Sequence, residues 1–223
     1  MGDEFDGKIV TLGDGAVGKT SLLIRYRDGQ FKDGYVPTIF DNFPLRRDIG
    51  GKSMNIMYWD TAGQEEYERL RALSYPGATC FVLCFSVDLR SSYTNVDTKW
   101  IPQLGQYRDK PIILVGTKAD LRASRPDCIT RAEGESMAKK IGAVAYMECS
   151  AKTGEGIDAT RADAPRGGRK GRLLHHPLKM RFSPHLGGNL LIVSLYNFLL
   201  LLPFFWASLR PPAVRSFIMP LSE

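Results

Sequence analysis

Gly13-Asp14-Gly15-Ala16-Val17-Gly18-Lys19-Thr20 fits the pattern G-x-x-x-x-G-K-[ST] and stands between an apolar run, Lys8 to Leu12, and a helix-like run, Ser21 to Tyr26. The glycines allow a tight turn whose N–H groups can approach phosphate oxygens. A helix that begins at about Lys19 adds N-terminal N–H groups and a dipole that favour an anion. Lysine in this pattern supplies charge to the phosphates, and the threonine hydroxyl can bind Mg²⁺. An ordinary glycine-rich turn would not require that pair, so the stretch predicts a phosphate-binding loop.

Composition indicates one globular domain, because 223 residues with a hydrophobic fraction of 43% can bury a good-sized core. The four cysteines lie in or beside apolar runs, without the spacing of a metal site or a disulfide framework. We therefore expect reduced, mostly buried thiols in a cytosolic protein. They are Cys80, Cys84, Cys128 and Cys149.

Charge is unevenly distributed along the chain. Residues 1–157 contain 21 Lys and Arg and 21 Asp and Glu, whereas residues 158–223 contain nine and three. The net charge of +6 therefore lies wholly in the tail, and no nucleic acid is expected as a partner of the main domain. The first six residues show no secretory signal and no myristoylation pattern, so we expect a cytoplasmic protein.

Apolar runs alternate with helix-like segments up to residue 157, the pattern of a mostly parallel sheet flanked by helices. A turn at Ile49 to Lys52 joins the second and third expected strands. The expected strands are Lys8 to Gly13, Phe43 to Ile49, Ser53 to Asp60, Cys80 to Ser86, Ile112 to Gly116 and Val144 to Cys149. The expected helices are Lys19 to Arg27, Glu66 to Leu73, Ser92 to about Gln106, and Arg131 to Ile141.

Asp60 ends a buried strand, and a turn of small residues follows it up to Gln64. A carboxylate in this place can hold Mg²⁺ through water, while Gly63 brings an N–H group to a phosphate; Asp60 as a simple helix cap is the alternative. Together with the phosphate loop, Thr117 to Asp120 and Ser150 to Lys152, this stretch resembles the guanine-specific motifs of Ras-superfamily GTPases. The resemblance covers residues 7–157 and implies a P-loop small-GTPase α/β fold with six strands.

Four further stretches resemble the Rho branch, and its Rac-like members most of all. They are Tyr35 to Thr38, Phe40 to Asn42, Glu68 to Pro76 and Thr98 to Trp100. This resemblance implies exchange factors, GTPase-activating proteins and effectors as partners, bound through Tyr35 to Phe43 and Trp59 to Tyr75. Phe43 replaces the usual tyrosine and lacks its hydroxyl, so effector contacts that need this hydroxyl are not expected. Trp59 is either bound by exchange factors or is a core aromatic at a strand end.

The resemblance also implies the nucleotide site. Asp120 would accept the guanine N1–H and amino hydrogens, which adenine cannot match. Lys118 and Phe31 would lie against the base, unless they are a solvated charge and a core side chain. Thr117 replaces the asparagine that is common in the superfamily. The implied binding residues are Gly13, Asp14, Gly15, Ala16, Val17, Gly18, Lys19, Thr20, Ser21, Phe31, Tyr35, Thr38, Asp60, Ala62, Gly63, Thr117, Lys118, Asp120, Ser150, Ala151 and Lys152.

GTP hydrolysis to GDP and phosphate is the implied activity, as a molecular switch for effector signalling of the cytoskeletal type. Gln64 would orient the attacking water, Lys19 would stabilise phosphoryl charge, and Thr38 would sense the γ-phosphate. Thr20, Thr38 and, through water, Asp60 would hold the Mg²⁺ cofactor. Hydrolysis should be slow without an activating protein, because no arginine finger is evident in the sequence. There are two alternatives. One is a catalytically weak or partly folded guanine-nucleotide-binding isoform that sequesters exchange factors or effectors. The other is an ATP-using P-loop enzyme, which Asp120 and Ser150 to Lys152 oppose.

Two departures from the Rho pattern stand out. Asp120 runs into Arg131 with about ten residues too few for the usual helical insert. After Ile157 the chain lacks the apolar spacing of a final helix, and Pro165 would break one. Loss of a helix that buries about five apolar side chains would cost on the order of 10 kcal/mol, which rivals the stability of a whole domain.

The tail divides into a basic linker, residues 158–189, an uncharged apolar segment, residues 190–209, and a short end, residues 210–223. A helix over residues 190–209 would span about 30 Å, the thickness of a bilayer core. No C-a-a-X cysteine is present, so binding to a prenyl-dependent inhibitor is not expected. Three interpretations of residues 190–209 stay open: a membrane anchor on the cytosolic face, a segment of alternative-exon or out-of-frame origin, and a helix that replaces the missing one.

Overall fold

The computed structural model describes residues 5–31, 33–34, 38, 40–49 and 52–157. Tyr35, the centre of the turn between Ile49 and Lys52, and the whole tail from residue 158 lie outside these residues. Among the described residues, no helix is long and apolar enough to cross a bilayer. The apolar segment 190–209 lies outside the described residues, so its role stays a prediction.

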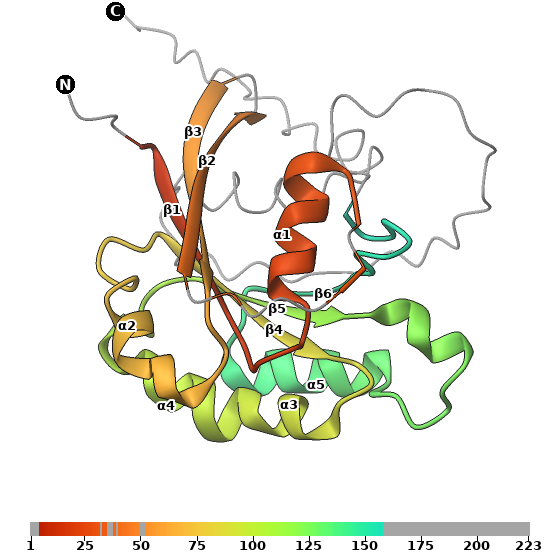
Figure 1. Cartoon of the computed structure of the whole chain (residues 1–223). Helices are drawn as coiled ribbons and strands as arrows, with labels where there is room; N and C mark the ends of the chain where they lie inside the picture. The colour runs from red at the N-terminus through yellow and green to blue at the C-terminus, as the bar shows by residue number, and fades with distance from the viewer. Residues whose placement is uncertain (1–4, 32, 35–37, 39, 50–51, 158–223) are drawn as a thin grey trace, which may run out of the picture.

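A single six-stranded sheet in the order β2-β3-β1-β4-β5-β6 forms the centre of the domain (Figure 1). β2 runs antiparallel to β3, and the other neighbours are parallel. This confirms the predicted α/β class with a mostly parallel sheet. The strands are β1 Gly7–Leu12, β2 Phe40–Ile49, β3 Lys52–Thr61, β4 Cys80–Ser86, β5 Ile112–Thr117 and β6 Ala145–Glu148.

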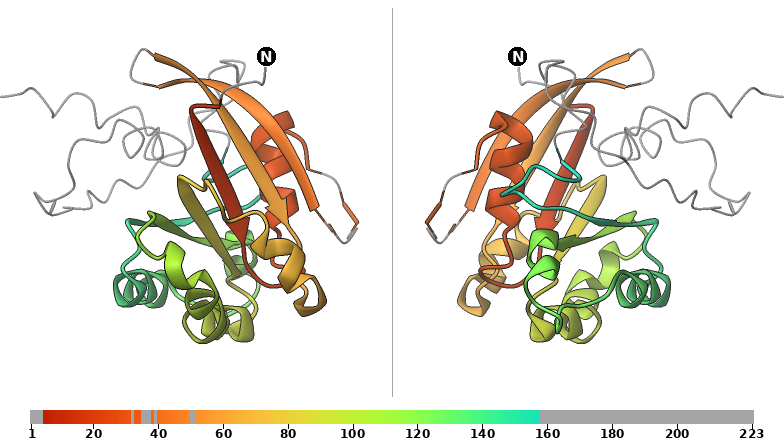
Figure 2. Two further views of the ribbon diagram at one scale, coloured as in Figure 1. Left: turned by 90° about the vertical axis from the view of Figure 1, so that its left-hand side faces the viewer. Right: turned by 90° about the vertical axis from the view of Figure 1, so that its right-hand side faces the viewer.

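β4 and β5 are central strands in which every residue is buried, as expected for parallel strands covered on both faces. One apolar cluster joins the sheet to α1 through Leu22, Leu23 and Tyr26. The other joins the opposite face to α3, α4 and α5 and includes the fully buried side chains of Trp100 and Leu104. Figures 1 and 2 show α1 on one side of the sheet and α2 to α5 on the other. The α-helices are α1 Lys19–Asp28, α2 Glu68–Ala72, α3 Arg90–Asn95, α4 Ile101–Leu104 and α5 Arg131–Ile141.

The helix predicted from Ser92 to Gln106 is wrong as one continuous α-helix. After α3 comes a π-turn, η2 Val96–Trp100, then α4 and a 3₁₀ turn, η3 Gly105–Tyr107. Pro102 has no N–H to donate to the carbonyl four residues earlier, and its ring crowds that carbonyl. A π-turn before the proline accommodates this, because the N–H of Ile101 bonds the carbonyl of Val96.

Two smaller differences concern boundaries. β2 begins at Phe40, three residues earlier than predicted, because Phe40 pairs with Thr61 at the end of β3. The helix predicted from Glu66 to Leu73 is instead a 3₁₀ turn, η1 Glu65–Tyr67, followed by α2. A further 3₁₀ turn that the sequence did not predict, η4 Ala119–Ala123, follows β5, and only residues 124–130 then connect it to α5.

Candidate functional site

The phosphate loop joins the end of β1 to the start of α1. Gly13 and Gly18 have φ angles of 137° and 97°, which side-chain-bearing residues rarely adopt. A Cβ atom at Gly13 would also lie 2.2 Å from the carbonyl oxygen of Cys84 in β4. The loop can therefore pass this close to the sheet only with glycine at position 13.

Lys19 is 6% exposed, and its ammonium group folds back over the loop. Nζ donates to the carbonyl oxygens of Gly13 and Asp14, each over 2.8 Å. An ammonium group has three N–H donors, so one remains for a phosphate oxygen. Burial lowers the pKa of Lys19 from 10.5 to about 8, partly offset by nearby acidic groups.

The residues predicted to hold Mg²⁺ come together. The hydroxyl oxygens of Thr20 and Thr38 lie 2.7 Å apart. Asp60 is 3% exposed, and its Oδ1 atom has no hydrogen-bond partner among the described residues. Burial raises the pKa of Asp60, against the opposing effect of hydrogen bonds from Thr20 and of the charge on Lys19. An unpartnered buried carboxylate oxygen beside two hydroxyls fits a hard divalent cation with bound water.

Gln64 lies on the loop between β3 and η1 and lines the same cleft as Lys19 and Thr20. A Cβ atom at Gly15 would lie 3.6 Å from Cγ of Gln64, which is ordinary contact distance. A Cβ atom at Gly63 would instead lie 2.2 Å from the carbonyl carbon of Asp14. The peptide of Gly63 therefore rests directly on the phosphate loop, with Gln64 next to it.

The phosphate half of the cleft has a volume of about 500 Å³. Its lining includes the predicted residues Gly15, Ala16, Gly18, Lys19, Thr20, Ser21, Phe31, Thr38, Ala62, Gly63, Gln64 and Lys118. It is thus open to a group of phosphate size at the N-terminus of α1.

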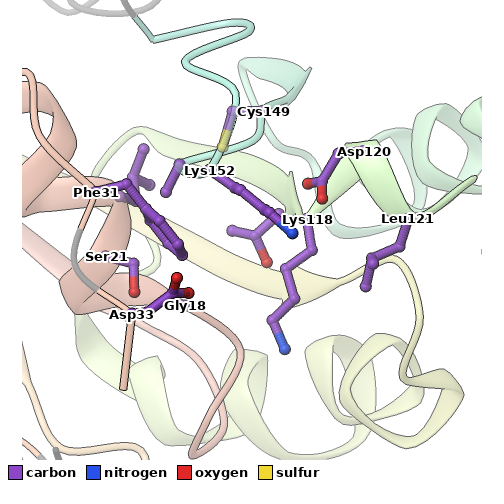
Figure 3. Close-up of a pocket in the computed structure, with 12 residues that line it drawn as sticks. Gly18, Ser21, Phe31, Asp33, Lys118, Asp120, Leu121, Cys149 and Lys152 are labelled. Atoms are coloured by element: carbon purple, nitrogen blue, oxygen red, sulfur yellow. The ribbon is translucent and has the colours of Figure 1, made fainter. Parts of the chain in front are cut away.

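The second half of the cleft has a volume of about 250 Å³. The residues that line both halves are Gly18, Ser21, Phe31, Asp33 and Lys118. Figure 3 shows the ring of Phe31 and the stem of Lys118 on opposite sides of this cavity. On the side of the segments that follow β5 and β6, the lining includes the predicted residues Thr117, Asp120, Ala151 and Lys152. A flat ring placed between Phe31 and Lys118 would meet the carboxylate of Asp120, which follows β5.

Thr117 ends β5 and is 3% exposed. Its hydroxyl lies 2.5 Å from the carbonyl oxygen of Val17 in the phosphate loop and 2.9 Å from that of Phe85 in β4. The hydroxyl donates one of these bonds at a time. Thr117 thus connects the phosphate loop to the two central strands, which is a role that a short hydroxyl side chain can fill in place of asparagine.

Several predicted residues support the cleft from behind instead of lining it. Ser150 is fully buried, and its hydroxyl accepts a hydrogen bond from the N–H of Thr153 over 3.1 Å. The others that do not line the cleft are Gly13, Asp14, Val17 and Asp60. Tyr35 lies outside the described residues, so its predicted contact stays a prediction.

The cleft also contains residues that the sequence did not single out. Asp33 lines both halves, and Cys149 lines the smaller one. Asp33 lies two residues after the predicted site residue Phe31, and this closeness in sequence was the one signal that could have identified it. All four cysteines are free and buried, as predicted. The other lining residues missed are Leu22, Ile24, Gly34, Thr61 and Leu121.

Three features of the cleft follow one another along the chain. They are a phosphate loop after β1, an acidic residue at the end of β3 and a ring-sized cavity after β5. A sequence model of the Ras family matches residues 8–166, which is more than half of the chain and contains the whole described site. Members of this family are GTP-hydrolysing switches that typically use GTP, GDP and Mg²⁺. The chain therefore belongs to the Ras family of small GTPases, which are nucleotide-binding switches.

Proposed function

We propose that this chain is a Rho-type small GTPase that binds guanine nucleotides in the cleft and hydrolyses GTP to GDP and phosphate. The observation that carries the proposal is the continuity of the cleft. Phe31 and Lys118 line both its halves, so a base held between them has its phosphates beside Lys19. Asp120 in the base half favours guanine, because a carboxylate only accepts hydrogen bonds and guanine offers two donors on one edge.

In the proposed reaction a water oxygen forms a bond to the γ-phosphorus as the bond to the β–γ bridging oxygen breaks. GDP leaves with that oxygen and its bonding electron pair, and a proton of the water passes to the released phosphate. Gln64 orients the water, and the third N–H of Lys19 and the loop amides hold the phosphoryl charge. Thr20, Thr38 and Asp60 would hold Mg²⁺, which supplies charge neutralisation at the phosphates when bound. The chain is expected to turn over slowly alone, and an activating protein would add a cation.

The proposed partner surface lies beside the Gln64 loop. Phe40 is 40% exposed, Leu70 48% and Leu73 71%, although all three are large apolar side chains. The ring of Phe40 packs edge-on against Trp59 at 4.9 Å. Exposed apolar groups at the start of β2 and along α2, which follow Thr38 and Gln64 in the chain, suit exchange factors, activating proteins and Rac-like effectors of cytoskeletal signalling.

The test is retained-nucleotide analysis of the purified full chain, followed by a single-turnover assay with radiolabelled GTP. We expect bound GDP or GTP, slow hydrolysis, and acceleration by a Rho-type activating protein. Gln64→Leu should lose the acceleration and keep nucleotide binding, while Gln106→Leu at an exposed position of η3 is the matched control. Bound adenine nucleotide, or equal turnover with and without the activating protein, would overturn the proposal.

A second candidate is a guanine-nucleotide-binding isoform with little turnover, which sequesters exchange factors. The observation that favours it concerns the α1 face of the sheet. Among the described residues, α1 is the only helix that contributes to the apolar cluster on that face. A full chain that binds GDP but shows no hydrolysis with an activating protein, and that inhibits exchange on a second GTPase, would support this candidate.

For the tail we propose that residues 190–209 anchor the protein to the cytosolic face of a membrane. The support is the sequence alone: an uncharged run of bilayer length with basic residues on its N-terminal side. Carbonate extraction of membranes should retain the full chain and release a chain cut at Asp158. Release of both would contradict the anchor.

A further inference from the structure

Asp14, the second residue of the phosphate loop, is held from outside the cleft by two donors. Nδ2 of Asn95 donates to its Oδ2 over 2.7 Å, and Nε1 of Trp100 donates to its Oδ1 over 2.8 Å. Each carboxylate oxygen thus has its own partner, and Asp14 lines neither half of the cleft. Hydrogen bonds to a charged group are stronger than those between neutral groups.

The π-turn explains how both donors reach one carboxylate. Asn95 and Trp100 are five residues apart, and in an α-helix that spacing would rotate them by about 140° from each other. In η2 the hydrogen bond runs over five residues, from Ile101 N–H to Val96 carbonyl. Residues five apart therefore come to the same side of the segment. An α-helical course here would remove one of the two donors from Asp14.

Trp100 also contacts a second charged residue. Arg71 is 1% exposed, and its guanidinium carbon lies 4.7 Å from the centre of the Trp100 ring. Nη1 of Arg71 donates to the carbonyl oxygens of Ala62 and Gln64, over 2.6 and 3.1 Å. These two carbonyls flank Gly63. A buried cation on an indole face thus holds the segment that carries Gln64.

The contacts form a closed ring. Gly63 rests on the peptide between Asp14 and Gly15, since a Cβ atom there would come within 2.4 Å of three backbone atoms of those residues. Asp14 is bonded to Trp100, Trp100 lies against Arg71, and Arg71 holds the carbonyls on either side of Gly63. The phosphate loop and the Gln64 loop are therefore connected at two places. One is the direct contact of Gly63 with the phosphate loop, and the other runs from Asp14 through Trp100 to Arg71.

We propose that Trp100 is a positioning residue for GTP hydrolysis, which sets the placement of Gln64 relative to the phosphate loop through Asp14 and Arg71. The inference rests on the proposed function. A merely space-filling role would require the aromatic ring and not its N–H group. The indole N–H and the stacked guanidinium are what connect the ring to both loops.

The test compares the full-length wild type with Trp100→Phe, which keeps an aromatic face for Arg71 and removes the N–H donor. Tyr93→Phe is the matched control, because it removes one donor from α3, the bond of the Tyr93 hydroxyl to the Glu133 carbonyl at 3.0 Å. We expect single-turnover hydrolysis about tenfold slower in Trp100→Phe and unchanged in Tyr93→Phe. In a Gln64→Leu background, Trp100→Phe should have no further effect.

Amide exchange in the GDP-bound protein gives a readout that does not depend on hydrolysis. Residues 62–72 and 13–17 should exchange faster in Trp100→Phe than in wild type, and not in Tyr93→Phe. If the wild type bound GDP without hydrolysing GTP, the proposed function would fail. Amide exchange would still show whether Trp100 holds the phosphate loop and the Gln64 loop in place. Unchanged exchange, or the same loss of rate with and without Gln64, would overturn the inference. If Trp100→Phe did not fold, benzothienylalanine at position 100, which replaces N–H by sulfur at equal volume, would take its place.

Discussion

The hydroxyl groups of Thr20 and Thr38 lie 2.7 Å apart, although one belongs to the first turn of α1 and the other to the segment before β2. Behind them, Asp60 keeps one buried carboxylate oxygen without a hydrogen-bond partner among the described residues. The contact brings Thr38 onto the end of the phosphate loop. A cation at this point would therefore connect nucleotide binding to the position of Thr38.

Thr38→Val tests this arrangement, since valine keeps the shape of threonine and lacks the hydroxyl. We expect the Mg²⁺ affinity of the protein bound to a GTP analogue to fall about tenfold, because one oxygen ligand is lost. The measurement is the free Mg²⁺ concentration that halves the release rate of a fluorescent GTP analogue. Thr98→Val is the control, because among the described residues the Thr98 hydroxyl donates only to the Thr94 carbonyl of its own helical segment, over 3.1 Å. An unchanged midpoint in Thr38→Val would exclude Thr38 as a ligand.

The low pKa of Lys19 predicts proton uptake when nucleotide binds. Burial lowers this pKa to about 8 in the free protein, and phosphates beside the ammonium group should raise it again. At pH 8.5 part of the free protein has lost the proton that the complex retains, so GDP affinity should fall as the pH rises above 8. In the free protein the unfolded state binds more protons between about 8 and 10.5, so stability should rise with pH over that window.

Calorimetry of GDP binding at pH 8.5, in two buffers with different ionisation enthalpies, measures the uptake. Lys19→Arg is the control, since a guanidinium group does not lose its proton in this range. Its binding should be weaker and should show no uptake. Equal binding enthalpies for the wild type in both buffers would contradict the assignment.

Thr117→Val should destabilise the GDP-bound protein by about 1–3 kcal/mol, because the buried carbonyl oxygen that accepts from the hydroxyl, that of Val17 or that of Phe85, loses its donor. GDP release should also become faster, since the phosphate loop is no longer connected to β5. Thr117→Ser keeps the hydroxyl and should behave like the wild type. The measurements are urea unfolding and the dissociation rate of a fluorescent GDP. A valine variant as stable as the serine variant would show that the hydroxyl contributes nothing.

The fold was predictable where local signals were sharp. α5 begins and ends at the predicted residues, because Thr130 and Glu133 form a reciprocal capping box and Gly142 ends the helix in the left-handed region. β4 has the predicted bounds because its seven buried residues form one apolar run. The π-turn was not predictable from periodicity, since the buried residues Val96, Trp100 and Leu104 keep an ordinary four-residue spacing on both sides of Pro102.

The site was predictable to the extent that its residues are contiguous in motifs. The loop residues from Gly15 to Ser21 and the side chains Lys118 and Asp120 line the cleft as predicted, apart from Val17. Arg71 shows what was not predictable. It sits in a short helix rich in charged residues, which suggests a solvent-exposed face, yet it is 1% exposed. Its burial depends on Trp100 and on two carbonyl groups from another segment, and no local pattern encodes that meeting.

Asp120→Asn should change the base that the cleft prefers. Asp120 is the carboxylate at the end of β5 that lines the smaller cavity, with Lys118 and Phe31 on either side of the space for a ring. Guanine offers an N1–H and an amino group to such a carboxylate, whereas the amide of asparagine accepts one hydrogen bond and donates the other. Xanthine has a carbonyl oxygen in place of the amino group and therefore matches the amide.

We expect Asp120→Asn to bind GDP at least 100-fold more weakly and to bind xanthosine diphosphate more tightly than the wild type does, on the order of discrimination seen when a buried hydrogen bond is mismatched. Competition against a fluorescent nucleotide measures both affinities. Asp33→Asn makes the same chemical change at the other acidic residue of the lining and serves as the control. Because the carboxylate of Asp33 is not proposed to contact the base, its variant should keep the preference for guanine. A loss of guanine preference in both variants would mean that the net charge of the cavity, and not the hydrogen-bond pattern of Asp120, selects the base.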